Sequence, residues 1–341
     1  MSYTTVHDSP VTASPADQRV EFTSLLSGCG VFELSNGVKI SLSGNDRMRW
    51  LNGMITNKVR DLPAGQGIYA FVLNPQGHIL GDLYAYNRSE SLLLDTDQSQ
   101  AEKLLGIFRK HIIMDKVDLA EMSDRLTAIG VAGPKVREVL RAAGFELHQL
   151  EPLQFVDVTW RDLALSVARG DNSTVESYEI WLAPEHVPLV RDALTKSGAT
   201  PIGTATLELF RIACGIPRYG QDIRERDLPQ ETEQLRALNF NKGCYIGQEI
   251  VERIRSRGAV HRKFTGFEVQ GLLPAAGTKI QFEGKDVGEV TSAACLPLPS
   301  GDLPVALGYI RHESATPGQL LQAGDARLTL AGVLFTEVFP K

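Results

Sequence analysis

Apolar and polar residues alternate in short runs near the start of the chain, which is the pattern of β-strands with one buried face. Residues 31–34 and 38–42 alternate in this way, and Ser35-Asn36-Gly37 between them is typical of a tight turn. We therefore expect these two runs to form a hairpin. Asn45-Asp46 is a candidate helix cap. Met48, Leu51 and Ile55 then recur at spacings of three and four, which predicts a helix ending near Thr56-Asn57.

A second hairpin is expected further along the chain. Residues 69–73 and 79–86 flank Asn74-Pro75-Gln76-Gly77, whose proline and glycine suit a type I turn. Another strand is predicted over residues 91–95 and a helix over residues 98–114. These elements together predict one α+β unit.

The alternation of strands and helices repeats from about residue 126 to 194 and then changes. Phe264 to Pro340 contains short β-like runs separated by Gly and Pro, which favours a small barrel or sandwich. The pattern predicts an α+β protein with a flexible N-terminal arm over 1–20, α+β domains over 21–125 and 126–255, and a β-barrel over 256–341. Ligands usually bind in clefts between domains, so we expect function at a junction.

Composition adds limits on the partners. The 341 residues are 43% hydrophobic and 22% charged, as in ordinary folded proteins. Because 41 acidic residues outnumber 35 basic ones, the field of the whole chain does not attract nucleic acid, and RNA contact is not expected. One dense basic segment, residues 253–263, is by default a solvated surface, with phosphate or a folate tail as alternative partners. Residues 1–18 resemble neither a signal peptide nor a membrane span, so we expect a cytoplasmic protein without membrane association.

The cysteines are scattered, and one of them stands apart. Cys29, Cys214, Cys244 and Cys295 form no CxxC pair, so neither a metal site nor a disulfide framework is expected. Around Cys244, flanking glycines let the backbone turn sharply and expose the thiol, and the nearby Lys242 would lower the thiol pKa. Most lone cysteines are small buried residues, so a reactive Cys244 competes with core packing. Cys214 fits burial, with pairing to Cys244 as the alternative.

The Cys244 segment, Lys242-Gly243-Cys244-Tyr245-Ile246-Gly247-Gln248-Glu249, closely resembles the signature of the YgfZ family. These proteins are folate-binding relatives of the glycine-cleavage T protein that support iron-sulfur proteins. The likeness extends from Leu228 to Arg253, and Thr56-Asn57, Asn74 to Gly77 with Asp82, and Arg211 to Gly220 resemble segments of the wider superfamily. The resemblance implies a GcvT-like, aminomethyltransferase-like fold, with two α+β domains and a C-terminal β-barrel around a central cleft.

The same resemblance implies the cofactor, the partners and the site. Tetrahydrofolate or a one-carbon derivative is the implied cofactor, and iron-sulfur client or assembly proteins are the implied partners. The implied folate-binding residues are Asn57, Asp82, Tyr84, Arg211 and Tyr219. The implied catalytic residues are Cys244, Lys242 and Asp82, and the signature residues are Lys242, Gly243, Cys244, Tyr245, Gly247, Gln248, Glu249 and Arg253.

Two departures from the aminomethyltransferase pattern bear on the chemistry. Those proteins carry a pattern similar to Gly-Gly-Ile-x-Asp-Asp at the position where this chain has Gly77 to Asp82. Gly81 therefore replaces one of the two paired acids. They also carry Arg-Leu-Glu-Ala-Gly, whose Glu grips the pterin ring, where this chain has Ala213. A carboxylate can hold the amide-like edge of a pterin through two hydrogen bonds, so its loss weakens or alters that grip.

The residues of the second hairpin leave alternatives open. Asp82 is either a cleft residue that acts as a base or a solvent-facing carboxylate beside a turn. Tyr84 and Tyr86 share its strand face by the period of two, so they either line a pocket and stack on a pterin or fill the core.

Three functions are compatible with these features. The first is a tetrahydrofolate-binding accessory factor for iron-sulfur proteins, with Cys244 as the reactive or ligand thiol. The alternative is a folate-dependent aminomethyltransferase or other one-carbon transferase that uses Asp82. The third is a non-catalytic module in which residues 253–263 bind a protein or RNA and Cys244 is structural. Only the alternative function, the one-carbon transferase, makes the chain an enzyme of a defined class.

Overall fold

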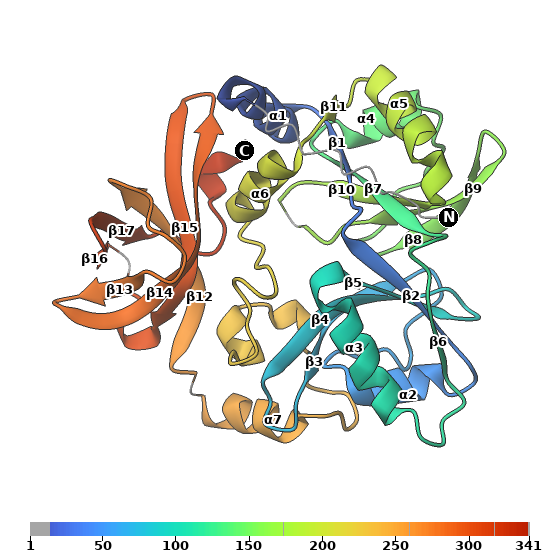
Figure 1. Ribbon diagram of the computed structural model, residues 1–341, viewed down its shortest axis with the longest axis horizontal. Helices are drawn as coiled ribbons and strands as arrows, with labels where there is room; N and C mark the ends of the chain where they lie inside the picture. Colours follow the sequence, from blue (N-terminus) through green and yellow to red (C-terminus); the bar gives the residue numbers. More distant parts are fainter. Residues whose placement is uncertain (1–13, 173, 259, 317, 340–341) are drawn as a thin grey trace, which may run out of the picture.

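The computed structural model describes residues 14–339 except 173, 259 and 317. Figure 1 shows three lobes, namely two α+β lobes and a β-barrel, arranged around a centre that helix α6 (Thr204–Ala213) borders. This arrangement confirms the predicted fold class of two α+β units and a C-terminal barrel.

The first lobe is a five-stranded sheet with helices against it. The strand order is β3-β4-β5-β2-β6, and all neighbouring strands are antiparallel. Its elements are β2 (Gly37–Ser43), α2 (Arg47–Met54), β3 (Gly67–Leu73), β4 (Ile79–Asn87), β5 (Leu92–Asp97), α3 (Gln98–His111) and β6 (Asp118–Glu121). The hairpin expected around Asn74 to Gly77 is present, because the amide of Gly77 donates to the carbonyl of Asn74 at 2.9 Å.

The second lobe is a six-stranded sheet in the order β11-β1-β7-β10-β9-β8. Its elements are β1 (Gly30–Glu33), β7 (Thr127–Ala132), α4 (Val136–Ala142), β8 (Phe155–Trp160), β9 (Leu163–Arg169), β10 (Ser177–Leu182), η1 (Pro184–His186), α5 (Val187–Lys196) and β11 (Thr200–Pro201). Helix α4 stops where Gly144 adopts a φ of 91°, a left-handed conformation that favours glycine.

The third lobe is a closed barrel in the order β12-β15-β14-β13-β16-β17. Its elements are β12 (Arg262–Gln270), β13 (Lys279–Phe282), β14 (Lys285–Leu298), β15 (Gly301–Arg311), η4 (His312–Ser314), β16 (Leu320–Ala323), β17 (Ala326–Leu330) and η5 (Thr336–Val338). Between α6 and the barrel the chain forms η2 (Pro229–Thr232), η3 (Leu235–Ala237) and α7 (Gln248–Arg257).

The first expected hairpin is wrong. Residues 31–34 and 38–42 are joined by a turn, but β1 pairs with β7 and β11 of the second lobe, whereas β2 pairs with β5 and β6 of the first. Alternation along a strand reports that one face is buried and does not identify the neighbouring strand. The chain therefore crosses from the second sheet to the first between Glu33 and Gly37.

The predicted arm over residues 1–20 also needs correction. Its first part, residues 1–13, lies outside the described residues, but Pro15–Ser27 form helix α1. Ser14 caps this helix through a reciprocal bond with Asp17, and Phe22 and Leu25 are fully buried against α6 and the barrel. The stretch lacks enough apolar residues for its own core, and helix α1 is held because Phe22, Leu25 and Leu26 are buried against other lobes.

The junction segment, residues 218–257, does not belong with the second lobe as the expected boundary at residue 255 implies. Ile223, Leu238, Tyr245 and Val251 pack against Phe71 and its neighbours on β3 and β4 of the first lobe. In Figure 1, α7 accordingly lies beside β3, far from the six-stranded sheet. No helix among the described residues combines the length and apolar character needed to span a membrane.

Candidate functional site: a cavity between the lobes

A cavity of about 560 Å³ opens where the two sheets and helix α6 meet. Its wall includes Asp82 and Tyr84 from β4, Glu179 from β10 and Phe210 from α6. Binding sites for small molecules are concave, with volumes of about 300–1,000 Å³ and a few polar groups in a mainly apolar wall. This cavity meets that description.

Asp82 is the best-fixed carboxylate in the wall. The Tyr69 hydroxyl donates to Oδ2 at 2.6 Å, and the Gln100 amide donates to Oδ1 at 2.6 Å. The backbone amide of Asp82 in turn donates to the Gln100 side chain at 3.0 Å. Burial raises the pKa of the Asp82 carboxyl, while the bonds from Tyr69 and Gln100 act in the opposite direction. The result is a carboxylate held in one orientation in a poorly solvated cavity.

An aromatic wall continues from Asp82 along β4. Tyr84 and Tyr86 both line the cavity, with ring centroids 6.4 Å apart and planes inclined by only 20°. Burial raises the pKa of both hydroxyls, so both rings are neutral at physiological pH. Tyr84 donates to Asp171 at 3.3 Å, and Asp171 forms an ion pair with Arg236, whose guanidinium lies 4.6 Å from the Tyr69 ring centre.

The other predicted folate residues differ in their surroundings. Arg211 lines the cavity, but its guanidinium is occupied by Glu208, Asp222 and the carbonyl of Ile216. Tyr219 also lines the cavity, and its hydroxyl accepts from Lys103. Asn57 is not part of the wall, because its amide donates to the carbonyls of Tyr69 and Arg236, both at 2.9 Å.

Lys242 anchors the Cys244 segment to the first lobe. Its ammonium donates to the carbonyls of Asn52, Ile55 and Asn57 at 2.6, 2.6 and 2.8 Å. Burial lowers the pKa of Lys242 to about 7. The protons of this ammonium are directed at backbone carbonyls around the end of α2.

Cys244 itself is exposed, and its thiol is free. Tyr245 is buried in the first lobe, Gly247 adopts a φ of 83° where α7 begins, and Glu249 and Arg253 are exposed on α7. Neither the Cys244 segment nor Arg253 contributes to the cavity wall. Of the predicted folate residues, Asp82, Tyr84, Arg211 and Tyr219 line the cavity, whereas Asn57 lies beside Lys242 of the Cys244 segment. Cys214 is half-buried and accepts from Asn172 at 3.3 Å, and it is likewise free.

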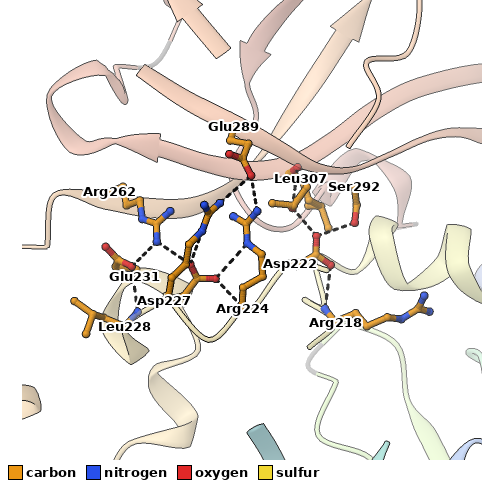
Figure 2. Close-up of polar contacts among 12 residues, drawn as sticks. Arg218, Asp222, Arg224, Asp227, Leu228, Glu231, Arg262, Glu289, Ser292 and Leu307 are labelled. Atoms are coloured by element: carbon orange, nitrogen blue, oxygen red, sulfur yellow. Dashed lines mark hydrogen bonds and ion pairs between the residues drawn. The ribbon is translucent and has the colours of Figure 1, made fainter. Parts of the chain in front are cut away.

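A network of ion pairs joins the junction segment to the barrel (Figure 2). Arg262 at the start of β12 pairs with Asp227 at 2.7 Å and with Glu231 at 3.0 Å. Arg224 reaches Glu289 on β14, and the fully buried Asp222 accepts from Ser292 at 2.7 Å. Arg262, which belongs to the predicted basic segment, therefore forms ion pairs that hold the barrel against the junction segment.

Several wall residues escaped the sequence analysis. Tyr69, Gln100, Asp171 and Arg236 surround Asp82 and Tyr84, and Lys39, Asp95 and Glu179 form a buried charged cluster. Lys39 carried no signal, because alternation places it with Ser41 on the polar face of its strand, where an exposed lysine is the usual case. The others required the relative placement of two sheets.

Comparisons with known proteins agree with this architecture. The GCVT N-terminal domain family matches residues 10–242, more than half of the sequence, and the chain belongs to this family. An aminomethyltransferase from Halothermothrix orenii is 26% identical over 314 residues, covering 88% of this chain and 87% of that protein. An aminomethyltransferase from Bacillus velezensis is 28% identical over 332 residues, with 94% and 89% covered.

A plant relative and a solved structure extend the comparison. The putative chloroplastic transferase At1g60990 of Arabidopsis thaliana is 25% identical over 306 residues, covering 88% of this chain and 69% of that protein. The crystal structure of the glycine cleavage system aminomethyltransferase T from Bartonella henselae superposes with a TM-score of 0.85, at 22% identity, over 96% of this chain and 91% of that one. The three-lobed fold is therefore that of the aminomethyltransferases, and the narrower resemblance to the YgfZ family stays a prediction.

Proposed function

We propose that this chain binds a reduced folate in the cavity between its lobes and carries out a folate-dependent one-carbon transfer of the aminomethyl type. The observation that carries the proposal is Asp82, a carboxylate lining the cavity that Tyr69 and Gln100 hold from both sides. The names of the relatives supply the reaction class, since the two bacterial relatives described above are aminomethyltransferases.

The cavity wall fits a reduced pterin by its chemistry. The nearly parallel rings of Tyr84 and Tyr86 offer flat apolar faces, and aromatic rings prefer such faces as neighbours. Carboxylates at Asp82 and Glu179 offer acceptors for ring N–H groups. A volume of about 560 Å³ admits a ligand of this size.

The reduced folate supplies amine nitrogens that carry a one-carbon unit, and the role of the chain is to bind, orient and manage protons. When an amine nitrogen of the folate bonds to the transferred carbon, the bond between that carbon and the donor's leaving atom breaks, the leaving atom keeps the electron pair, and the amine must release its proton. Asp82 is the group that accepts this proton, because its pKa is raised by burial and its orientation is fixed before the reaction. The absence of a carboxylate at Gly81 leaves Asp82 to do this alone.

The test is Asp82→Asn, which keeps the shape and can still contact Tyr69 and Gln100. Product formation from an aminomethyl donor and tetrahydrofolate should fall about 100-fold or more, because positioned acid–base groups contribute about 10²–10⁴. Tetrahydrofolate affinity, measured by calorimetry, should change much less. Asp118→Asn on the exposed strand β6 is the matched control. A wild-type chain that binds tetrahydrofolate but forms no product refutes the transferase reaction and leaves the binding proposal.

Cys244 supports a second candidate function, upkeep of iron-sulfur proteins. Its thiol is exposed, while Lys242 fixes the segment around it through three carbonyls. A rigidly presented thiol suits a transient contact with a client protein or its cluster. In a strain lacking the protein, Cys244→Ala should fail to restore iron-sulfur enzyme activity. Cys295→Ala, which removes another exposed thiol, should restore it fully. Full restoration by Cys244→Ala contradicts this function.

A further inference from the structure

Two large apolar side chains project from the first lobe into solvent. Ile113 and Met114, between α3 and β6, are 83% and 93% exposed, the highest values among the large apolar residues that the structure describes. Figure 1 places the connection from α3 to β6 on the side of the first lobe that faces away from the barrel. Single apolar residues are ordinary on a protein surface, so exposure alone assigns no role to this apolar tip, residues 112–116. The way in which the tip is held does.

The tip is fixed to helix α2 on both sides. Before it, the indole of Trp50 donates to the carbonyl of His111 at 3.1 Å. After it, the amide of Lys116 donates to Oδ2 of Asp46 at 2.8 Å, and the amide of Asp46 donates back to the carbonyl of Lys116 at 3.2 Å. A fixed loop that holds two apolar side chains away from the core is preorganised for a partner, because little conformational entropy remains to be lost on binding.

Helix α2 also connects the tip to the Cys244 segment. Arg49 forms an ion pair with Asp115 of the tip, and the carbonyl of Gly53 accepts from the amide of Ile246 at 3.2 Å. Positions 49 and 53 lie on the same face of α2, about 6 Å apart along its axis. Ile246 follows the exposed Cys244 by two residues. The tip and the thiol therefore border one face of α2, and a partner that covers about 800 Å² of this chain reaches both.

The exposed charges around the tip are mainly basic. Within residues 109–118, Arg109, Lys110 and Lys116 are exposed, against one exposed acid, Asp118. Arg49 adds a side chain that is 63% exposed. This surface suits a partner that is acidic where it makes contact. The charge of -6 on the whole chain opposes the extended negative surfaces of nucleic acid and lipid, whereas a protein can confine its acids to the contact.

We propose that the apolar tip, the exposed face of α2 and the Cys244 segment form one docking surface for a protein partner with an apolar slot and an acidic rim. Ile113 and Met114 enter the slot, and methionine suits this role because its unbranched side chain adapts to the shape of its surroundings. The basic residues beside the tip face the rim, and the bound partner covers Cys244. This surface lies outside the cavity, so the inference does not depend on folate binding.

The experiment begins with photo-crosslinking in cells of the organism that encodes the chain. The full chain carries p-benzoylphenylalanine in place of Met114, and the matched control carries it in place of Leu272, which is 76% exposed on the barrel lobe. A protein that is captured in place of Met114 but not in the control is then purified. Its affinity for the unmodified chain is measured by calorimetry at several salt concentrations.

The affinities of variants test the slot and the rim. Ile113→Ser combined with Met114→Ser should weaken binding about 10-fold or more, because a few apolar anchors carry most of the binding energy of an interface. Leu272→Ser should leave the affinity unchanged. Lys110→Gln combined with Lys116→Gln should weaken binding and reduce its dependence on salt, because screening acts on exposed charges. An affinity that does not depend on salt overturns the acidic rim.

Alkylation of the thiols tests whether the partner covers Cys244. A saturating concentration of the purified partner should slow the reaction of Cys244 with iodoacetamide about 10-fold or more. Cys295, the exposed thiol of the barrel, should react at its original rate. An unchanged rate at Cys244 overturns the shared surface. Crosslinks from the tip to a second copy of this chain, to lipid, or to nothing beyond the Leu272 control overturn the proposed partner, and folate binding is untouched by each of these results.

Discussion

The ammonium of Lys242 donates to the backbone carbonyl of Ile55 at 2.6 Å, across 187 residues of sequence. Ile55 is the C-cap residue directly after helix α2, so its carbonyl has no partner within that helix. Asn52 and Asn57 present their carbonyls to the same ammonium. A side chain predicted to activate a thiol is therefore a three-point anchor between the junction segment and the first lobe.

Replacing this anchor should cost stability. Lys242→Met removes the donors of three carbonyls that are screened from water, and the free energy of unfolding should fall by about 2–4 kcal/mol. Urea denaturation at neutral pH measures the change. Lys58→Met, on an exposed lysine whose one ion pair within the described part of the chain is with Asp61, should stay within about 0.5 kcal/mol of wild type. Equal effects of the two substitutions contradict the anchor.

The two glycines that flank Cys244 should differ sharply in tolerance. Gly247 has a φ of 83°, and a Cβ there would lie 2.7 Å from the carbonyl oxygen of Asn74 in the β3–β4 turn. Gly243 has open space around its Cα. Gly247→Ala should therefore lower the free energy of unfolding by about 1–3 kcal/mol, whereas Gly243→Ala should change it by less than about 1 kcal/mol. Thermal or chemical denaturation of both variants is the measurement, and similar losses in both would falsify the assignment of Gly247 as a packing requirement.

The sequence was sufficient to predict strand pairing where the two partners are close along the chain. The hairpin at Asn74 to Gly77 is of this kind, because turn residues and alternation determine local pairing. The barrel was predicted only as a class, since its β12 pairs with the distant strands β15 and β17. Pairing of β1 with β7 depends on residues nearly 100 positions apart, and no local pattern encodes it. Helix α1 was missed for a related reason, since its apolar face is stabilised by other lobes.

The site shows the same division between local and distant information. Asp82, Tyr84 and Tyr86 share one strand face, and the structure puts all three on the cavity wall. The charged cluster of Lys39, Asp95 and Glu179 needs two sheets to meet, which residue spacing cannot reveal. The Cys244 segment does not line the cavity, although its Tyr245 packs in the same cluster as Tyr84 and Tyr219 of the wall.

The four cysteines should react with iodoacetamide in an order set by exposure. Cys244 and Cys295 are exposed, whereas Cys29 is buried and Cys214 is half-buried. Burial raises the pKa of both Cys29 and Cys214 to about 12, so little thiolate is present to react. Peptide mass spectrometry after brief alkylation should find Cys244 and Cys295 modified and the other two intact until denaturant is added. Early labelling of Cys214 argues against its described environment.

Glu289 should make the barrel contact sensitive to acid. Burial on its own would raise the Glu289 pKa, but hydrogen bonds from Lys279 and Arg224 outweigh it and lower the pKa to about 2. The folded-state pKa lies below the unfolded one. The contribution of the ionised Glu289 carboxylate to the free energy of unfolding is therefore complete above about pH 5 and is lost as the pH falls toward 2. Glu289→Gln should be less stable than wild type at pH 7, with the difference shrinking by pH 3 in denaturation measurements. Glu283→Gln, in the exposed turn before β14, should show no such dependence.

Tyr69 offers a test of Asp82 that a packing role would not affect. Burial raises the Asp82 pKa, and the hydroxyl of Tyr69, donating at 2.6 Å, opposes that rise. Tyr69→Phe removes this opposition, so the Asp82 pKa should increase further and the proton-accepting carboxylate should be lost at higher pH. The acidic limb of the kcat/KM profile for product formation should then move to higher pH, since this profile reports the free enzyme. Tyr309→Phe, which removes a buried barrel hydroxyl with no partner among the described residues, should leave the limb in place. An unmoved limb in Tyr69→Phe means that Asp82 does not set the pH dependence.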